Sequence, residues 1–291
     1  MTINKEDVKK LREMTGVGIG DCKNALEEAN GNFDKAIEII KEKGLAKAVK
    51  KADRAVGDGR IAIYKDQENL SGALVKIECE TDFVSNSEPF REFADTLVKK
   101  IYDKNITSID HLDDEIEKLR SAAVLKFNEN IKITDICIMR GDEQHLVFPY
   151  VQMGKNGAIV EFELNKSFKE ISDSTKLEDF KYILYSIVVS VEFYKPEYYS
   201  LEDVPAEKIE EEMKLVKKQL EDDPAFKNKP ENVLENIIKG KAKNSFIDKV
   251  FLECPYVREQ SKKVRDILSE VEKTFGIKVK ANKFYFTQIG S

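Results

Sequence analysis

The chain has 291 residues, of which 48 are Lys or Arg and 54 are Asp or Glu, giving a net charge of −6 with two histidines. A chain of this length is expected to fold as two or three domains, and 41% hydrophobic residues can supply real cores, which excludes a disordered protein. The acidic balance argues against direct binding of nucleic acid, because DNA- and RNA-binding proteins carry basic surfaces for phosphates. It is compatible with a protein partner.

The N-terminus has no apolar signal region, and no run of 18 apolar residues occurs in the chain. We therefore predict a soluble, cytoplasmic protein that does not contact a membrane. The cysteines are far apart and fit no zinc or redox spacing, so we expect them to be reduced and mostly buried. They are Cys22, Cys79, Cys137 and Cys254.

The first 53 residues predict a module of three short helices. Asp21 is a plausible N-cap of the second helix, Asn32 or Asp34 begins the third, and Gly44 stands where a helix C-terminus favours glycine. A bundle of this size has no room for an active-site cleft, so we expect a binding module. The apolar residues at helical spacing are Val8, Leu11, Met14, Ala36, Ile37 and Ile40.

Residues 41–60 contain seven basic and three acidic side chains. We interpret this stretch as a basic helical linker whose solvated face joins two domains. A weak contact with an acidic surface of a partner is the alternative.

The pattern changes to that of strands after residue 60. Two apolar segments separated by a turn at 67–72 precede a helix whose apolar face includes Phe90 and Ile101. A similar order follows, and GAIVEFEL at 157–164 resembles GALVKIEC at 72–79. We therefore predict two related α/β halves, each with helices packed on an antiparallel sheet. The expected strands are 61–64, 73–79, 133–139, 146–152 and 157–164, and the second helix is expected over 177–191.

A long helical stretch interrupts the second half. Its first arm has a heptad seam, its return arm has apolar residues every four positions, and the breaker at 222–230 contains Pro224 and Pro230, so we predict a protruding antiparallel hairpin. A helix around 264–275 and a last strand at 277–286, which pairs back into the second sheet, complete the chain. The seam is Ile209, Met213, Val216 and Leu220, and the return arm has Leu234, Ile238, Ala242, Phe246 and Val250.

These segments predict a multidomain α+β protein. Its parts are the three-helix module with its linker (1–53), the first core subdomain (54–140), the second core subdomain (141–200 and 253–291) and the inserted hairpin (201–252).

The sequence contains none of the standard catalytic motifs in complete form. GVGIGD at 16–21 follows no strand, Gly154-Lys155 lacks the rest of a phosphate-binding loop, and His111 and His145 belong to no metal-type cluster. Carboxylates such as Glu115, which we expect to pair with Lys118, fit solvated helix faces. We therefore predict no catalytic residue, no metal site and no bound cofactor.

One segment has no role in the assignments above. It lies directly after a strand that is predicted to be buried, and consists of Thr81, Asp82, Phe83 and Val84. In one interpretation, Thr81 or Asp82 caps a turn and Phe83 fills its own core. In the other, Phe83 is a wedge that inserts into a partner while Asp82 acts at a polar or metal-bearing site there. The residues alone leave both open, with a generic interaction scaffold and a small-molecule enzyme of α+β type as the broader alternatives.

Several segments together resemble the elongation factor Ts family, in the family's order and over nearly the whole chain. They are LREMTGVGIGDCKNALEEANGNFDKAIEIIKEKG at 11–44, ECETDFV at 78–84, YVQMGKNGAIVEFEL at 150–164, KPEYYSLEDVPAEKIEEE at 195–212 and KPENVLENIIKGKAKNSFIDKVFLECPYV at 229–257. Many members have histidine where this chain has Gln152.

The resemblance implies a guanine-nucleotide exchange factor of elongation factor Tu that performs no covalent catalysis and needs no cofactor. The family's TDFV motif falls on Thr81, Asp82, Phe83 and Val84, and in the family it enters the partner's GTPase domain and displaces Mg²⁺. The resemblance also implies that the N-terminal module is UBA-like and contacts the GTPase domain, that the core halves bind a second domain of the partner, and that the hairpin is a coiled coil.

Overall fold

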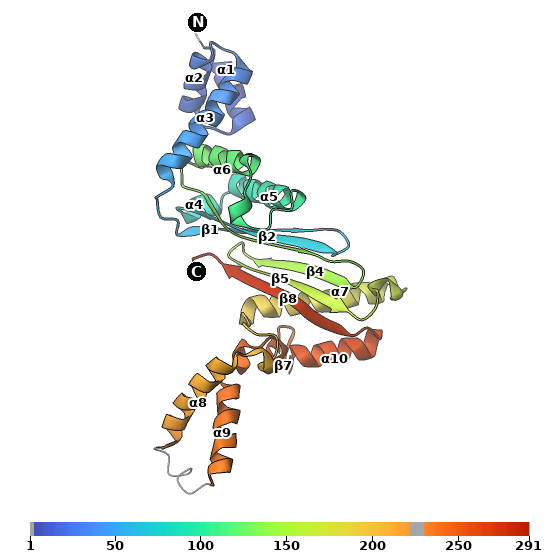
Figure 1. Cartoon of the computed structure of the whole chain (residues 1–291). Helices are drawn as coiled ribbons and strands as arrows, with labels where there is room; N and C mark the ends of the chain where they lie inside the picture. Colours follow the sequence, from blue (N-terminus) through green and yellow to red (C-terminus); the bar gives the residue numbers. More distant parts are fainter. Residues whose placement is uncertain (1–2, 222–229, 291) are drawn as a thin grey trace. The chain divides into compact units, whose positions relative to one another are not determined.

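The computed structural model describes residues 3–221 and 230–290 and is a mixed α+β structure (Figure 1). It contains two compact units. The first comprises Met1–Arg140 with Val151–Ile159 and Thr287–Ser291, and the second comprises Gly141–Tyr150 with Val160–Phe286.

Three helices open the first unit: α1 (Lys5–Thr15), α2 (Ile19–Glu28) and α3 (Phe33–Lys51). Asn32 caps α3 as predicted, because its side chain accepts a hydrogen bond from the Lys35 amide. Asp21 is not the cap of α2: the helix begins earlier, at Ile19, and Asp21 lies in its first turn. The shared core contains Val8, Leu11, Cys22, Ala25, Leu26, Ala36 and Ile40, whereas Met14 is exposed.

Helix α3 runs through Gly44, so the predicted end of this helix is wrong. It packs against α6 (Asp114–Phe127), and a Cβ atom at Gly44 would lie 3.1 Å from the carbonyl oxygen of Ser121. Glycine therefore serves a close approach of two helices here. Most of the expected linker is the second half of α3, and Lys51 at its end is buried and donates to the carbonyl of Asn128 at 2.5 Å.

The first sheet has the order β1-β2-β3 and is antiparallel throughout. Its strands are β1 (Asp58–Lys65), β2 (Ser71–Cys79) and β3 (Lys132–Arg140). Helix α5 (Glu88–Asp103) packs on β1 and β2, with Phe90, Leu97 and Ile101 in the core. Between β2 and α5 lies α4 (Asp82–Ser85), a single helical turn.

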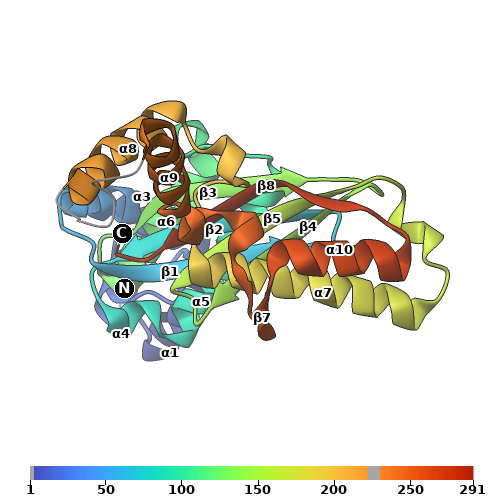
Figure 2. The ribbon, with the colours of Figure 1, turned by 90° about the horizontal axis from the view of Figure 1, so that it is seen from below.

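The second sheet has the order β4-β5-β8, with β4 (His145–Gln152), β5 (Asn156–Leu164) and β8 (Val279–Gln288). The predicted return of the last strand to this sheet is confirmed. Helices α7 (Ser174–Tyr194) and α10 (Val264–Phe275) lie beside one another in both views (Figures 1 and 2). A short ribbon of β6 (Pro255–Tyr256) and β7 (Glu259–Lys263) adjoins α10.

Two further helices of the second unit, α8 (Ala206–Glu221) and α9 (Glu231–Asn244), pack against each other through a small apolar core of Val216, Leu220, Ile238 and Ala242. Helix α9 ends at Asn244, before the predicted Phe246 and Val250. The breaker predicted over 222–230 lies, except for Pro230, outside the described residues. The short 3₁₀ turns are Ile109–His111, Phe168–Glu170, Leu201–Asp203, Ile247–Lys249 and Phe251–Glu253.

The cysteines are thiols, and three of them are buried, as predicted. Burial raises the pKa of Cys79 and of Cys254 to about 12, so both thiols stay protonated at neutral pH. No helix in the described ranges is long and apolar enough to cross a membrane.

Candidate partner-binding site

Phe83 lies on α4 with 85% of its surface exposed to solvent. The interpretation in which Phe83 fills its own core is therefore wrong. Asp82 is also exposed, whereas Thr81 and Val84 are half-buried and Val84 packs against the core of the first sheet. The four predicted residues thus divide into an outward pair and an inward pair. A large aromatic ring left in water has a cost, and such rings often mark binding surfaces.

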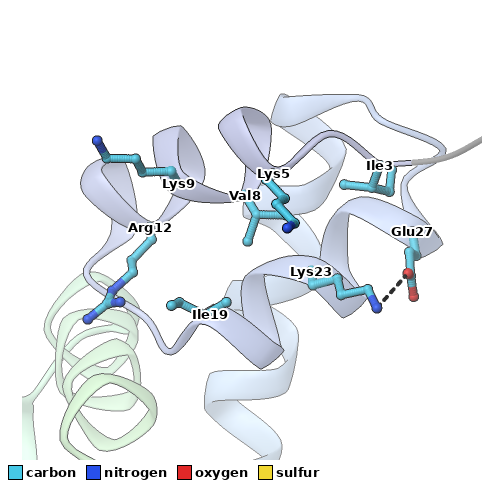
Figure 3. A pocket seen from close by; sticks show the side chains of 8 residues that line it. All are labelled: Ile3, Lys5, Val8, Lys9, Arg12, Ile19, Lys23 and Glu27. Carbon is cyan, nitrogen blue, oxygen red and sulfur yellow. Dashed lines mark ion pairs between the residues drawn. The ribbon is translucent and has the colours of Figure 1, made fainter.

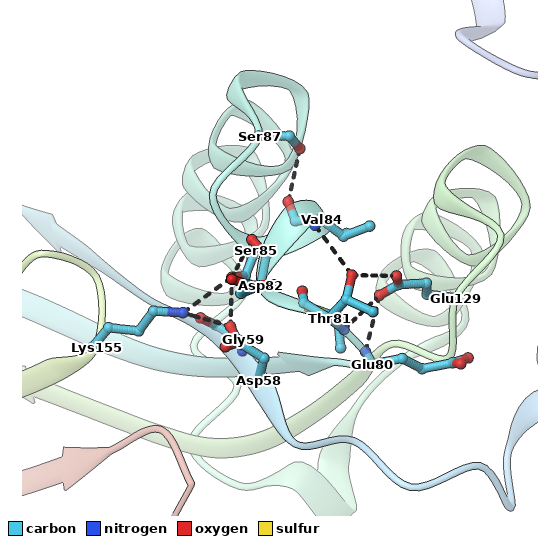
Figure 4. A network of polar contacts seen from close by, with 11 residues as sticks. Asp58, Gly59, Glu80, Thr81, Asp82, Val84, Ser85, Ser87, Glu129 and Lys155 are labelled. Atoms are coloured by element: carbon cyan, nitrogen blue, oxygen red, sulfur yellow. Dashed lines mark hydrogen bonds and ion pairs between the residues drawn. The ribbon is translucent and has the colours of Figure 1, made fainter.

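Thr81 starts α4 and is held by a carboxylate from a distant loop (Figure 4). Glu129, between α6 and β3, accepts hydrogen bonds from the amides of Glu80 and Thr81, each at 3.0 Å to Oε2. Its other oxygen accepts the hydroxyl of Thr81 at 2.6 Å. The same hydroxyl oxygen accepts from the Val84 amide at 3.4 Å, in the position of an N-cap.

The other end of α4 is tied to β1 through the buried hydroxyl of Ser85, which donates to Asp58 Oδ1 at 2.5 Å. Lys155 Nζ, from the turn between β4 and β5, donates to Asp58 Oδ1 at 2.5 Å, to Ser85 Oγ at 3.0 Å and to the carbonyl of Gly59 at 2.8 Å. Burial alone raises the pKa of Asp58, but the hydrogen bonds from Lys155, Ser85 and the Gly59 amide outweigh it, so the pKa lies below its ordinary value.

A third brace connects the two loops on the Thr81 side. Glu80 Oε1 accepts from the amide of Asn130 at 2.6 Å, and the Asn130 side chain donates to the carbonyls of Ala52 and Arg54 at 3.2 and 2.8 Å. The bond from the Asn130 amide is the largest of the interactions that lower the pKa of Glu80, followed in that direction by Arg54. The three carboxylates around α4, Glu129, Asp58 and Glu80, are therefore used as fixed hydrogen-bond acceptors.

A second exposed surface lies on the N-terminal helices (Figure 3). It is a groove of about 630 Å³ between α1 and α2, and Ile19 on its wall is 56% exposed. Lys23 pairs with Glu27 one turn further along α2 at 3.6 Å. The lining combines apolar Ile3, Val8 and Ile19 with Lys5, Lys9, Arg12, Lys23 and Glu27. A surface of this kind suits an acidic, partly apolar partner.

Neither surface has the parts of a catalytic centre. Among the residues that the structure describes, no three His, Cys, Asp or Glu side chains are grouped to hold a metal ion. His145 lies at a strand hairpin with its Nδ1 2.9 Å from Asp142 Oδ1, which fits the predicted turn histidine. His111 is exposed in a 3₁₀ turn.

Sequence reasoning found the exposed residues but missed those that hold them. Glu129 and Asp58 gave no signal, because acidic residues are abundant and their partners are distant in sequence. The sequence around Lys155 resembles only an incomplete phosphate-binding loop. Its position just before the run 157–164, which resembles 72–79, could have marked Lys155 as notable. Its contact with Asp58, 97 positions away, could not be predicted in this way.

An exposed aromatic on a braced turn, together with a basic and apolar groove, defines a protein that acts by binding another protein. Comparison with known proteins gives the particular family. The family model "Elongation factor TS" matches residues 80–291. Elongation factor Ts of Aquifex aeolicus is 34% identical over 305 aligned positions, which cover 100% of this chain and 99% of that protein.

Other relatives agree. Elongation factor Ts of Nautilia profundicola is 36% identical and covers 97% of this chain and 91% of its own length. The protein of Borreliella burgdorferi is 32% identical, with 99% of both chains covered. The chain belongs to the elongation factor Ts family, whose members are cytoplasmic translation factors. It is a nucleotide-exchange factor for elongation factor Tu rather than an enzyme.

Proposed function

We propose that α4 is the element that releases the nucleotide: Phe83 inserts into the GTPase domain of elongation factor Tu, and Asp82 accompanies it toward the Mg²⁺ of the nucleotide site. The observation that carries this proposal is the 85% exposure of Phe83 on a turn whose two ends are hydrogen-bonded to the core. A ring held in this way loses little conformational freedom when it inserts, so the free energy of its burial can deform the nucleotide site and is not offset by ordering of the loop.

Displacement of Mg²⁺ explains how insertion releases GDP. Mg²⁺ demands near-octahedral oxygen ligands and links the nucleotide phosphates to protein oxygens, so a shift of its ligands removes the charge compensation of the phosphates. The exposed carboxylate of Asp82 brings negative charge to this region and opposes rebinding of the phosphates. Thr81 and Val84 stay with the factor's own core, and they form the base of the wedge.

Thermodynamic linkage sets the direction of the reaction. When the exchange factor weakens the binding of GDP to elongation factor Tu, GDP weakens the binding of the exchange factor by the same free energy. GTP therefore displaces the factor in turn, and nucleotide concentrations decide which complex accumulates. No cofactor or covalent step on this chain is needed.

We further propose a division of the chain along the lines predicted from the sequence. Residues 1–53 form a UBA-like module whose groove binds the GTPase domain, and the core subdomains (54–140, and 141–200 with 253–291) bind a second domain of the partner. Residues 201–252 form a coiled-coil hairpin. The basic and apolar lining of the groove and the packed seam of α8 and α9 support these assignments.

The test is the release of fluorescent GDP from elongation factor Tu, followed after addition of excess unlabelled GDP, with and without this protein. We expect the wild-type protein to accelerate release and Phe83→Ala to lose most of the acceleration. Leu215→Ala, which removes an apolar side chain that is 54% exposed on α8 in the hairpin, is the matched control. Equal rates for wild type and Phe83→Ala would show a scaffold whose TDFV segment does not act on the nucleotide.

A further inference from the structure

Helix α4 is too short to fix its own direction. Its ends contribute three backbone hydrogen bonds, Ser85 to Thr81 at 3.2 Å, Asn86 to Asp82 at 3.0 Å and Ser87 to Val84 at 3.0 Å. One turn of helix is unstable by itself, because nucleation fixes several dihedral angles for few hydrogen bonds. The direction of Phe83 must therefore be set by contacts from outside α4.

The Cys79 thiol donates to the Thr81 carbonyl at 3.3 Å, and the other contacts from outside α4 on the N-terminal side are made by one residue, Glu129. It accepts three hydrogen bonds, two from consecutive amides at Glu80 and Thr81 and one from the Thr81 hydroxyl. The carboxylate uses both of its oxygens and faces donors only. Hydrogen bonds to an ionised acceptor are stronger than neutral ones, so this set fixes the backbone two residues before Phe83.

Glu129 is itself held in register by its neighbour. The Asn130 amide donates back to Glu80 Oε1, so the two loops exchange hydrogen bonds in both directions. Asn130 is fully buried, and its side chain is fixed by the carbonyls of Ala52 and Arg54. The loop that carries Glu129 is thus anchored by hydrogen bonds to the segment before α4 and to the segment after α3.

We infer that Glu129 is a positioning residue for nucleotide exchange: it holds Thr81, and through it α4, so that Phe83 points outward in the direction needed for insertion. The inference rests on the proposed role of Phe83. Glu129 is half-buried and turned toward Thr81, so it acts from behind the wedge and needs no contact with the partner.

The variant Glu129→Gln isolates this role. It keeps the shape of the side chain but replaces one acceptor oxygen by an NH₂ group, which faces donors and cannot satisfy all three of them. We expect the GDP-release rate at saturating factor to fall about tenfold, which is the scale of a lost hydrogen bond to a charged group. The factor concentration at half-saturation should change less than about twofold, because the groove surface is untouched.

The matched control is Glu115→Gln, at the other end of α6. It removes the ion pairs of Glu115 with Lys100 and Lys104, at 2.6 and 2.8 Å, within the same unit but about 18 Å along the helix axis from Phe127. We expect Glu115→Gln to release GDP at the wild-type rate. Hydrogen exchange at the Thr81 amide should become faster in Glu129→Gln and stay slow in Glu115→Gln.

The deciding experiment is a double-mutant cycle with Phe83→Ala. If Glu129 acts through α4, Glu129→Gln adds less than about twofold in the Phe83→Ala background. Independent losses that multiply in the double variant would overturn the inference, as would a wild-type rate for Glu129→Gln while Phe83→Ala is slow. A wild-type rate for Phe83→Ala alone would instead overturn the proposed function, and the inference with it.

Discussion

The α4 turn and the groove between α1 and α2 are both exposed, but they are built in opposite ways. At α4 one ring stands out from a base whose polar groups are hydrogen-bonded at both ends. The groove has no such projecting group and is a broad surface lined by apolar side chains together with lysine and arginine side chains. A braced projection suits an action that depends on direction, whereas a charged, adaptable surface suits attraction and affinity.

The largest effect should come from shortening the projection. Phe83→Ala removes the whole ring, and we expect the release rate at saturation to fall about 30-fold or more, as for a central aromatic in an interface. Phe83→Leu keeps part of the volume and should lose only a few-fold. The series is measured by stopped-flow release of fluorescent GDP. Equal rates for the Leu and Ala variants would show that buried volume at this position is not what drives release.

A smaller effect, of another kind, is expected at the groove. Arg12→Glu reverses one charge of the lining and should raise the half-saturating factor concentration about tenfold, with the saturated rate unchanged. The effect should shrink as salt rises, because exposed charges are screened. Lys41→Glu, an exposed change on α3 outside the groove, is the control. A lowered saturated rate for Arg12→Glu would break the contrast between the two surfaces.

The next prediction concerns the packing of α3, which belongs to the N-terminal module, against α6. Gly44→Val places a branched side chain against the Ser121 carbonyl and should cost about 1–3 kcal/mol of unfolding free energy, measured by urea denaturation. Gly20→Ala is the matched control, because Gly20 lies in α2 with open space beside it, and it should be neutral or stabilising by up to about 1 kcal/mol. Two equally destabilised variants would argue against close packing of α3 on α6.

The smallest effect concerns the pH dependence of stability through Asp58. Its pKa is lower in the folded protein, so its stabilising contribution is present above the unfolded value of about 3.9 and is lost as the pH falls through the folded value. Asp58→Asn should therefore be less stable than wild type by about 1 kcal/mol at pH 7 and pH 5.

The stability gap should narrow below about pH 4. Urea unfolding at these pH values checks it. A gap that widens in acid would contradict the assigned direction of the pKa.

Local patterns were sufficient to predict much of the secondary structure. The helix Val264–Phe275 was predicted with its observed ends, and the strand segments lie within β1, β2 and β5, because periodicity and turn residues decide these elements. Gly44 was misread as a helix end, since only the contact with α6 shows why glycine is needed inside α3. Glu115 pairs with Lys100 and Lys104 rather than with the predicted Lys118, because residues of another helix reach it.

The candidate site was predictable only where it depends on local sequence, and not where it depends on contacts between distant residues. The segment from Thr81 to Val84 stands out in the sequence, and its resemblance to a family motif suggested a role. The turn that carries the exposed Phe83 is held by Glu129, which accepts from Thr81 48 positions away, and by Lys155, which bonds to Asp58. No local pattern records these contacts.

The central claim is that the projection determines how fast GDP leaves, while the groove determines how tightly the factor binds. The most direct test is one titration of fluorescent-GDP release from elongation factor Tu against wild type, Phe83→Ala and Arg12→Glu. We predict that Phe83→Ala lowers the saturated rate with little change in half-saturation, and that Arg12→Glu does the reverse. Two variants that change the same parameter, or exchanged effects, would contradict the account.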